Sequence, residues 1–212
     1  MMTIRETYLG AAESAVGLLA DPAVAAEWQE PSALADFTVG GLAAHLAFQI
    51  FCVPSVLAEA PGDEEPIGLL DHYARAAWVD AGLDDEPNVA LRRRGEELAA
   101  DGAEQTTARA ERTVADLRDV LADEPADRAV LLPWNGWSLF LDDFLVTRTM
   151  ELTVHSDDLA VSVGVPTPPA SPEAADVVAV LLTRLAVRKH GLTPVLRALS
   201  RAERAPETIA AF

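Results

Sequence analysis

Two residues that can bind a metal, Glu151 and His155, lie four positions apart in the segment MELTVHSDDLA. This spacing puts two side chains on one face of a helix, with Cβ atoms about 5–6 Å apart. Both can then reach a single ion at ligand distances of about 2.0–2.2 Å. The same spacing also fits an ordinary solvated helix face, with Arg148 and Glu151 as a surface ion pair. The pair alone is therefore weak evidence for a metal site.

A third candidate ligand, His45, lies in the almost wholly apolar stretch GGLAAHLAFQIF and is its only ionisable side chain. Burial disfavours a charged histidine and leaves its ring nitrogens in need of partners. If the two segments form helices that pack side by side, His45 can face Glu151 and His155. The three would form a His2Glu set with an open coordination position, which is typical of catalytic sites and can activate a bound water or thiol. The alternative is a hydrogen-bonded core triad without a metal.

Residues near the candidate ligands have predicted supporting roles. Arg148, one turn before Glu151, can bind a ligand carboxylate or orient Glu151, or form a plain ion pair with it. Asp158, three residues after His155, can accept the free ring N–H of that histidine; an exposed acid is the alternative. Cys52 lies too far along its helix to bind the same ion, and we expect a packed core thiol there.

Helical segments must position these residues. Apolar periodicity, capping residues and breaks at proline and glycine predict helices over residues 3–20, 39–60, 69–81, 88–121, 139–163, 173–190 and 194–201. Thr38 and Ser138 are the predicted caps of the two helices that carry the candidate ligands. Gly95 and Gly102 weaken the middle of the longest helix. No series of residues is strong enough to indicate a sheet.

The fold class that follows is all-α. Substantial helices with connections of unequal length predict a four-helix bundle with an additional C-terminal helical tail. The longest connection, ADEPADRAVLLPWNGWS, holds Trp134 and Trp137, which either cap the bundle or form a wall of the site. His72 and His190 lack partners at ligand spacing, so we interpret both as lying outside the site.

Charge and composition exclude several classes of function. The chain of 212 residues has a formal net charge of −18 at pH 7, which argues against nucleic acid or an anionic membrane as a partner. It has one cysteine, so no internal disulfide is expected and a reducing compartment is natural. We find no signal peptide, and no run approaches the roughly 20 apolar residues of a membrane span. We therefore expect a cytoplasmic protein.

Two segments, FTVGGLAAHLA and RTMELTVHSDDLAVSVG, resemble the signature segments of the mycothiol-dependent maleylpyruvate isomerase family. The segment LPWNGWSLFLDDFL resembles a loop of that family, and the ending RALSRAERAPETIAAF resembles the tail of its shorter actinobacterial members. The family belongs to the DinB-like superfamily of metal-binding four-helix bundles. The resemblance implies a family-type bundle over residues 1–165 and a helical C-terminal extension over residues 166–212.

The resemblance also implies a metal and a thiol. It assigns the metal ligands to His45, Glu151 and His155, with zinc as the usual metal. Mycothiol, the low-molecular-weight thiol of actinobacteria, is the implied cosubstrate, activated as a metal-bound thiolate. In the isomerase branch, the thiolate adds to an activated double bond and later leaves. In the S-transferase branch, it attacks an electrophile and stays attached.

The C-terminal part differs from that of the isomerase, which carries a separate domain that contributes an arginine to the active site. Here residues 166–212 are predicted to be helical, with Arg188, Arg197, Arg201 and Arg204 among their basic residues. We therefore expect a metal-dependent, mycothiol-using S-transferase or isomerase that acts on a small electrophile. The alternative is a non-catalytic bundle that binds a metal or ligand. The apolar tail is also compatible with a homodimer.

Overall fold

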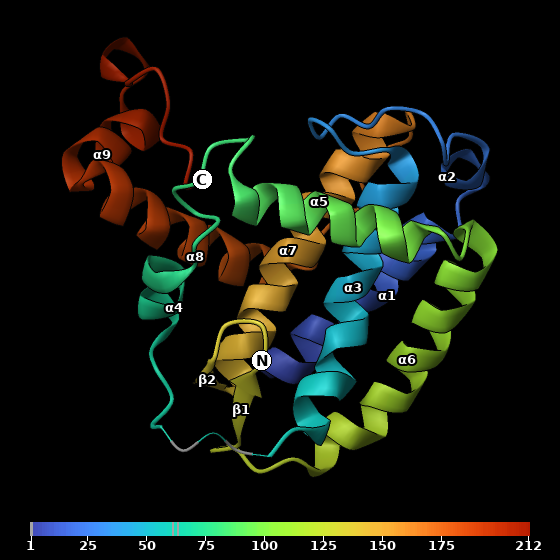
Figure 1. Ribbon diagram of the computed structural model, residues 1–212. Coiled ribbons are helices and arrows are strands. Elements are labelled where there is room, and N and C mark those ends of the chain that lie inside the picture. Colours follow the sequence, from blue (N-terminus) through green and yellow to red (C-terminus); the bar gives the residue numbers. More distant parts are fainter. Residues whose placement is uncertain (1, 61, 63) are drawn as a thin grey trace.

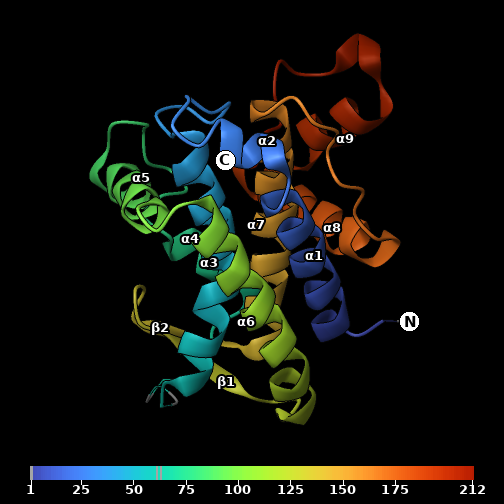
Figure 2. The ribbon, with the colours of Figure 1, turned by 90° about the vertical axis from the view of Figure 1, so that its right-hand side faces the viewer.

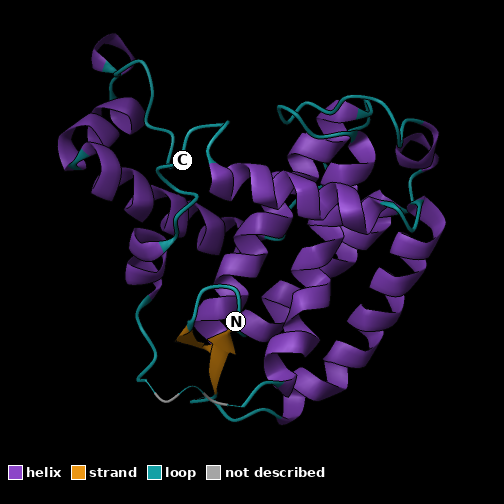
Figure 3. Cartoon of the chain, viewed as in Figure 1, coloured by secondary structure: helices purple, strands orange, loops and turns teal. Residues whose placement is uncertain are grey.

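Long helices packed around a common core form the body of the protein, in a computed structural model that describes residues 2–60, 62 and 64–212 (Figure 1). The bundle helices are α1 (Ile4–Leu19), α3 (Val39–Ala58), α6 (Ala103–Asp123) and α7 (Leu141–Ser162). Helices α1 and α3 each pack against both α6 and α7, which closes the bundle (Figure 2). The buried centre is mostly aliphatic, so apolar burial is its main source of stability. The predicted all-α bundle is confirmed (Figure 3).

The helix that carries His45, α3, is apolar on almost every side. Thr38 caps it by accepting a hydrogen bond from the backbone N–H of Gly41, as predicted. By length and composition, Val39–Ala58 could cross a membrane, which corrects the expectation that no segment approaches this. In an 18-residue apolar window of this helix, 67% of the residues are buried inside the protein. A helix buried in a protein core needs apolar residues on most sides, so it can have the same composition as a membrane span.

The long helix predicted over residues 88–121 is wrong, because the structure divides it into α5 (Glu86–Ala99) and α6. Gly102 separates the two with a φ of 82°, a left-handed conformation that glycine adopts without strain. Helix α5 crosses α3 at very close range: a Cβ atom on Gly95 would lie 2.8 Å from the carbonyl oxygen of Gly41. The small residues at this crossing therefore hold α5 over the first turn of α3.

A short β-hairpin precedes α7, where no sheet was predicted. Its strands β1 (Ala129–Leu132) and β2 (Trp137–Phe140) pair antiparallel. Gly136 has a φ of 80° in the turn, and its N–H donates to the carbonyl of Leu132 at 2.8 Å. Ser138 lies within β2, so the prediction that it caps the following helix is wrong. Strands of four residues give too short an alternation to be recognised from sequence.

Two shorter helices also differ from their predicted bounds. Helix α2 (Pro22–Ala26) occupies a segment predicted as a loop, and Asp21 caps it by accepting from a backbone N–H. A proline at the first position and an acidic cap suffice for such a short helix. Helix α4 (Leu69–Arg75) ends before the predicted bound at residue 81, because the backbone is already extended at Ala76.

The predicted C-terminal helical tail is present. It consists of α8 (Pro172–His190), α9 (Leu192–Ser200) and the 3-10 helix η1 (Ala202–Arg204). Helix α8 packs against α7 and α4, and α9 packs on α8. A second, smaller apolar cluster lies between α4, α7 and α8 and includes Tyr73 and Met150. This cluster joins the tail to the helix that carries Glu151 and His155.

Candidate metal centre

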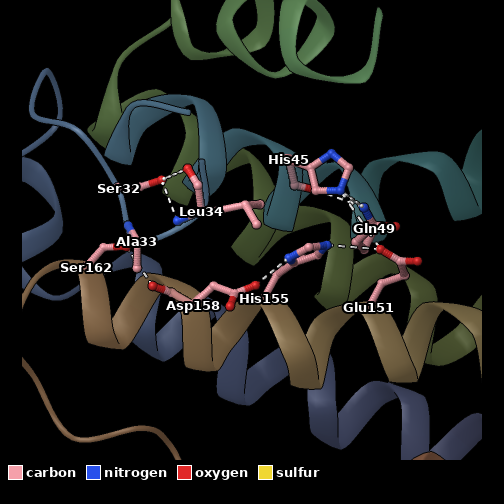
Figure 4. A network of polar contacts seen from close by, with 9 residues as sticks. All are labelled: Ser32, Ala33, Leu34, His45, Gln49, Glu151, His155, Asp158 and Ser162. Atoms are coloured by element: carbon pink, nitrogen blue, oxygen red, sulfur yellow. Dashed lines mark hydrogen bonds and ion pairs between the residues drawn. The ribbon is translucent and has the colours of Figure 1, made fainter. Parts of the chain in front are cut away.

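The three candidate ligands come from two adjacent helices of the bundle (Figure 4). His45 lies in the second turn of α3, and Glu151 and His155 lie one turn apart within α7. The orientation of α7 about its own axis is fixed by leucines that it buries in the main core, namely Leu141, Leu145, Leu152 and Leu159. The structure therefore brings together the residues that sequence analysis selected.

The ligand atoms of the three side chains converge. Nε2 of His155 lies 3.1 Å from Oε2 of Glu151, and Nε2 of His45 lies 3.9 Å from the same oxygen. One ligand atom from each residue lies within 4.8 Å of the others. Two atoms bound tetrahedrally to one ion at about 2.1 Å are about 3.4 Å apart, so small side-chain rotations would suffice for a common ion. Two imidazoles and a carboxylate suit zinc and leave one position open.

The group lies at the edge of the core, with the side chains of His45, Glu151 and His155 15%, 13% and 16% exposed. Behind it, Oδ2 of Asp158 lies 2.9 Å from Nδ1 of His155. An ionised carboxylate can only accept, so Nδ1 donates and Nε2 is the nitrogen that faces Glu151. The predicted contact between Asp158 and His155 is thus present, and it leaves the correct nitrogen available for a metal.

Burial and neighbouring charges shift the pKa values within the group. Burial alone would lower the pKa of His155, but its hydrogen bonds to Asp158 and Glu151 raise it to about 9. Burial lowers the pKa of His45, against the effect of the nearby carboxylate of Glu151. Burial would raise the pKa of Glu151, but its hydrogen bond with His155 and the nearby His45 hold it well below its usual range. Without a metal, Glu151 and His155 are therefore an ion pair beside a neutral His45.

The ion pair between Arg148 and Glu151, one of the alternatives predicted from the sequence, is not formed among the described residues. Nη1 of Arg148 contacts Oε1 of Gln49, and Nε of the same arginine donates to Oγ1 of Thr147 at 3.0 Å. Nε2 of Gln49 donates to the backbone carbonyl of His45 at 3.0 Å. The same nitrogen lies 3.3 Å from Nε2 of the His45 ring. Arg148 is therefore linked to His45 by contacts through Gln49, a buried amide that sequence analysis missed.

The signal for Gln49 was available in the sequence. Gln49 is the one amide in an otherwise apolar helix, and it lies four residues after His45, on the same face. A buried amide needs hydrogen-bond partners, which here are the backbone of its own helix and the guanidinium of Arg148. Such an isolated polar residue beside an isolated histidine indicates a polar site on that face.

Three residues that were interpreted as lying outside the site are not among the candidate metal ligands of the described residues. Cys52 is 1% exposed, and burial raises the pKa of its thiol to about 11. Nδ1 of His72 accepts a hydrogen bond from Nε1 of Trp137 at 3.1 Å, which ties α4 to β2. His190 contacts the backbone carbonyl of Ala210.

The two tryptophans of the hairpin pack against the bundle. The ring of Trp134 lies 6.0 Å from that of Phe48 on α3 and 6.5 Å from that of Phe144 on α7, centroid to centroid. The ring of Trp137 lies 5.9 Å from that of His72. The hairpin thus contacts α3, α7 and α4 through these two aromatic residues.

The fold and the site together define a class, helical bundles with a His2Glu group between two of their helices. The chain belongs to the family described as the mycothiol maleylpyruvate isomerase N-terminal domain, which matches residues 9–160. The fold resembles two solved structures, the mycothiol-dependent maleylpyruvate isomerase and its histidine-to-alanine mutant, with TM-scores of 0.53 and 0.52. In both cases the identity is 17%, over 89% of this chain and 73% of the other. No curated protein matches the sequence.

These comparisons confirm the family and the DinB-like fold that the two signature segments indicated. The matched residues 9–160 include His45, Glu151 and His155, whereas the tail lies outside the match. At 17% identity, the likeness to the solved structures shows the fold alone.

Proposed function

We propose that this protein is a metal-dependent enzyme that uses mycothiol in an S-transferase or isomerase reaction on a small electrophile. The observation that carries the proposal is the convergence of His45, Glu151 and His155, whose ligand atoms lie within 4.8 Å of one another. Family membership and the likeness to mycothiol-dependent maleylpyruvate isomerase support mycothiol as the thiol. When bound, a divalent metal such as zinc would lower the pKa of a thiol at its open position and make it a better nucleophile.

The position of Cys52 supports a thiol that comes from outside the chain. Cys52 is the single cysteine of the sequence, and its Sγ is buried, 3.7 Å from the carbonyl oxygen of Gln49. Because burial raises its pKa to about 11, very little thiolate is present at neutral pH. A small soluble thiol, in contrast, can reach a partly exposed site between two helices.

The residues of the chain prepare the site in complementary ways. Asp158 holds Nδ1 of His155, so the ring presents Nε2 to the site. His45 is already neutral and can bind a cation without losing a proton. His155 is protonated and must release a proton before it can bind, and Asp158 keeps its ring in place when it does. Glu151 stays anionic throughout, which favours a cation at this position.

The ion pair itself favours a second candidate function. Nε2 of His155 and Oε2 of Glu151 lie 3.1 Å apart and satisfy each other without any metal. A bundle in which this pair is only structural, or in which the site binds a ligand without turnover, would serve as a binding or regulatory protein. Metal content separates the structural pair from the other functions, and turnover then separates an enzyme from a binding module.

Metal analysis after zinc reconstitution is the first test. We expect about one zinc per chain, and loss of this zinc in the His45→Ala variant, because the remaining two ligands hold the ion too weakly. The matched control is His190→Ala, which removes a histidine of the tail whose Nε2 lies 2.8 Å from the backbone carbonyl of Ala210. A wild-type chain that binds no zinc, or a His45→Ala variant that binds it as well as wild type, would contradict the proposed site.

Turnover with mycothiol and a panel of electrophiles is the second test. An S-transferase consumes the thiol as product forms, whereas an isomerase converts its substrate and returns the thiol unchanged. Thiol titration and product analysis on the same samples therefore distinguish the two reactions. If the zinc-loaded protein gives no product with any member of the panel, the binding module becomes the better assignment.

A further inference from the structure

A buried hydroxyl without a partner lies close to the candidate metal centre. Tyr73, on α4, is 3% exposed, and within the described residues its hydroxyl has no hydrogen-bond partner. An unpaired buried hydroxyl is energetically costly, and buried polar groups in folded proteins almost always have partners. Such an unpaired group needs an explanation, and one explanation is that it forms a hydrogen bond with a bound ligand.

The neighbouring residue supplies a second donor, although of the two only the hydroxyl of Tyr73 is a buried atom without a partner. His72 is 5% exposed, and burial lowers its pKa to about 4, so its ring is neutral at pH 7. Nδ1 accepts from Nε1 of Trp137, so the single proton of the ring is on Nε2. The described residues offer Nε2 no acceptor, and the His72 and Tyr73 rings lie 5.0 Å apart, edge to face. Two neutral donors without acceptors thus lie side by side on α4.

Packing places this pair beside the part of α7 that carries the candidate ligands. Tyr73 belongs to the apolar cluster between α4, α7 and α8, together with Met150 and Val154. These two residues directly precede Glu151 and His155 in the sequence. The charge of Glu151 also acts on both Tyr73 and His72, which agrees with a short distance between the pair and the site.

We propose that His72 and Tyr73 bind a carbonyl or carboxylate oxygen of the electrophilic substrate beside the metal centre, an inference that rests on the proposed function. Neutral N–H and O–H donors match an oxygen acceptor, and the buried surroundings strengthen such hydrogen bonds. Arg148 and Glu151 both act electrostatically on the two donors, with opposite signs, and at Tyr73 the effect of Glu151 is the larger one. The substrate class is therefore a small electrophile that carries a carbonyl or carboxylate group.

Phe212 packs against the aromatic group that contains Tyr73. The ring of Phe212 lies 5.8 Å from that of Tyr73 and 4.9 Å from that of Trp78. Phe212 itself is 40% exposed, so it lies on the outside of this aromatic group.

Ligand binding to the cobalt(II)-loaded full chain tests the donor pair, with pyruvate as a probe that carries both a carbonyl and a carboxylate. The visible absorption of cobalt reports on a ligand near the open position, independently of turnover. We expect wild type to bind pyruvate, and the Tyr73→Phe and His72→Asn variants each to raise its Kd about tenfold. Asparagine keeps an acceptor for Trp137 while it removes the Nε2 donor.

The matched control is Tyr8→Phe, because the buried hydroxyl of Tyr8 donates to the carbonyl of Gln49 at 3.3 Å. We expect this control to lower the melting temperature and leave the Kd for pyruvate unchanged. Tyr73→Phe should not lower the melting temperature, because it removes a group without a partner. Tyr8→Phe should therefore change the melting temperature but not the Kd for pyruvate, and Tyr73→Phe should change the Kd but not the melting temperature.

The outcomes separate this inference from the function on which it rests. If the cobalt-loaded wild type gives no spectral response to pyruvate, or if Tyr73→Phe and His72→Asn bind it as well as wild type, the donor pair is wrong while the metal centre stands. If the chain binds no cobalt, the metal centre fails and the donor pair fails with it. Weaker pyruvate binding in both variants, with unchanged cobalt content, supports the pair.

Discussion

The side chains of His155 and Asp158 lie one turn apart on α7, with Nδ1 of the histidine 2.9 Å from Oδ2 of the acid. This contact fixes the ring while Nε2 faces Glu151. It also adds a negative charge behind the histidine, which makes Nε2 a better electron donor toward a cation. Asp158 can therefore strengthen the binding of a metal ion by His155 without itself touching the ion.

From this contact, we expect Asp158→Asn to raise the Kd for zinc about 10- to 100-fold. Asparagine keeps the size of the side chain and loses its charge, so the fold should be retained. A competition titration against a chelator of known affinity measures the effect. The matched control is Asp157→Asn, since Asp157 accepts a hydrogen bond from Thr167 instead. Equal affinities for the two variants would remove the role assigned to Asp158.

The raised pKa of His155 predicts the pH dependence of stability for the metal-free protein. The folded state holds a proton on His155 up to a pKa of about 9, whereas an unperturbed histidine releases it near 6.5. The stabilisation is therefore fully present below pH 6.5 and is lost as pH rises from 6.5 to 9. Urea unfolding across this window should show the decline. His155→Gln, which does not titrate, should show a flatter profile.

Zinc binding should have the opposite pH dependence. Because His155 is protonated below a pKa of about 9, each zinc that binds must expel its proton. The affinity for zinc should therefore rise about tenfold per pH unit between pH 7 and 8. Calorimetry in two buffers of different ionisation enthalpy measures the number of protons released, and we expect about one per zinc. Release of no proton would mean that His155 is neutral before the metal binds.

The members of the ligand group could be recognised from local signals, and the resemblance to the family supplied their grouping across two helices. Helical periodicity puts Glu151 and His155 on one face, and His45 is conspicuous in an apolar stretch. The position of Arg148 could not be predicted in the same way. Its distance to Glu151 along the helix suggests an ion pair, but packing of α7 against α3 brings the buried oxygen of Gln49 within its reach. Whether Arg148 contacts Glu151 or Gln49 depends on how α7 packs against α3, and this packing cannot be inferred from the sequence of either helix alone.

The division of the predicted long helix and the hairpin were missed for different physical reasons. Gly102 was recognised as a weak point, but its left-handed backbone depends on where α5 must turn to cross α3. The hairpin strands β1 and β2 have only four residues each, so strand-favouring residues such as Val130 and Trp137 do not form a long enough pattern to stand out in the sequence. In the first case, tertiary packing decides between local conformations of similar energy.

The close crossing of α5 and α3 predicts the effect of adding one methyl group. A Cβ on Gly95 would lie 2.8 Å from the carbonyl oxygen of Gly41 and 2.9 Å from Cε1 of Phe37. Because the backbone of α3 cannot yield locally, we expect Gly95→Ala to lower the free energy of unfolding by about 1–3 kcal/mol. Guanidinium unfolding measures this change. The control Gly17→Ala, in α1 with no atom within 4 Å of the added Cβ, should stabilise by about 0.5–1 kcal/mol.

The contact between Arg148 and Gln49 predicts a loss of both stability and metal binding when the guanidinium is removed. Gln49 is 1% exposed, so Arg148→Met would leave its Oε1 without a partner in the core. We expect the free energy of unfolding to fall by about 1–3 kcal/mol. Zinc should also bind more weakly, because Gln49 already lies 3.3 Å from Nε2 of His45, and without Arg148 its amide is no longer held by the guanidinium and can compete for this nitrogen.

The matched control is Arg93→Met, which removes an arginine whose side chain is 66% exposed and pairs with Glu97 on the surface of α5. Exposed pairs contribute little, so we expect a change within about 0.5 kcal/mol and no change in zinc affinity. Urea unfolding and a zinc competition titration on both variants measure the difference. If Arg148→Met behaves like the surface variant in both measurements, Gln49 finds its hydrogen bonds elsewhere, and the link from Arg148 to His45 has no energetic weight.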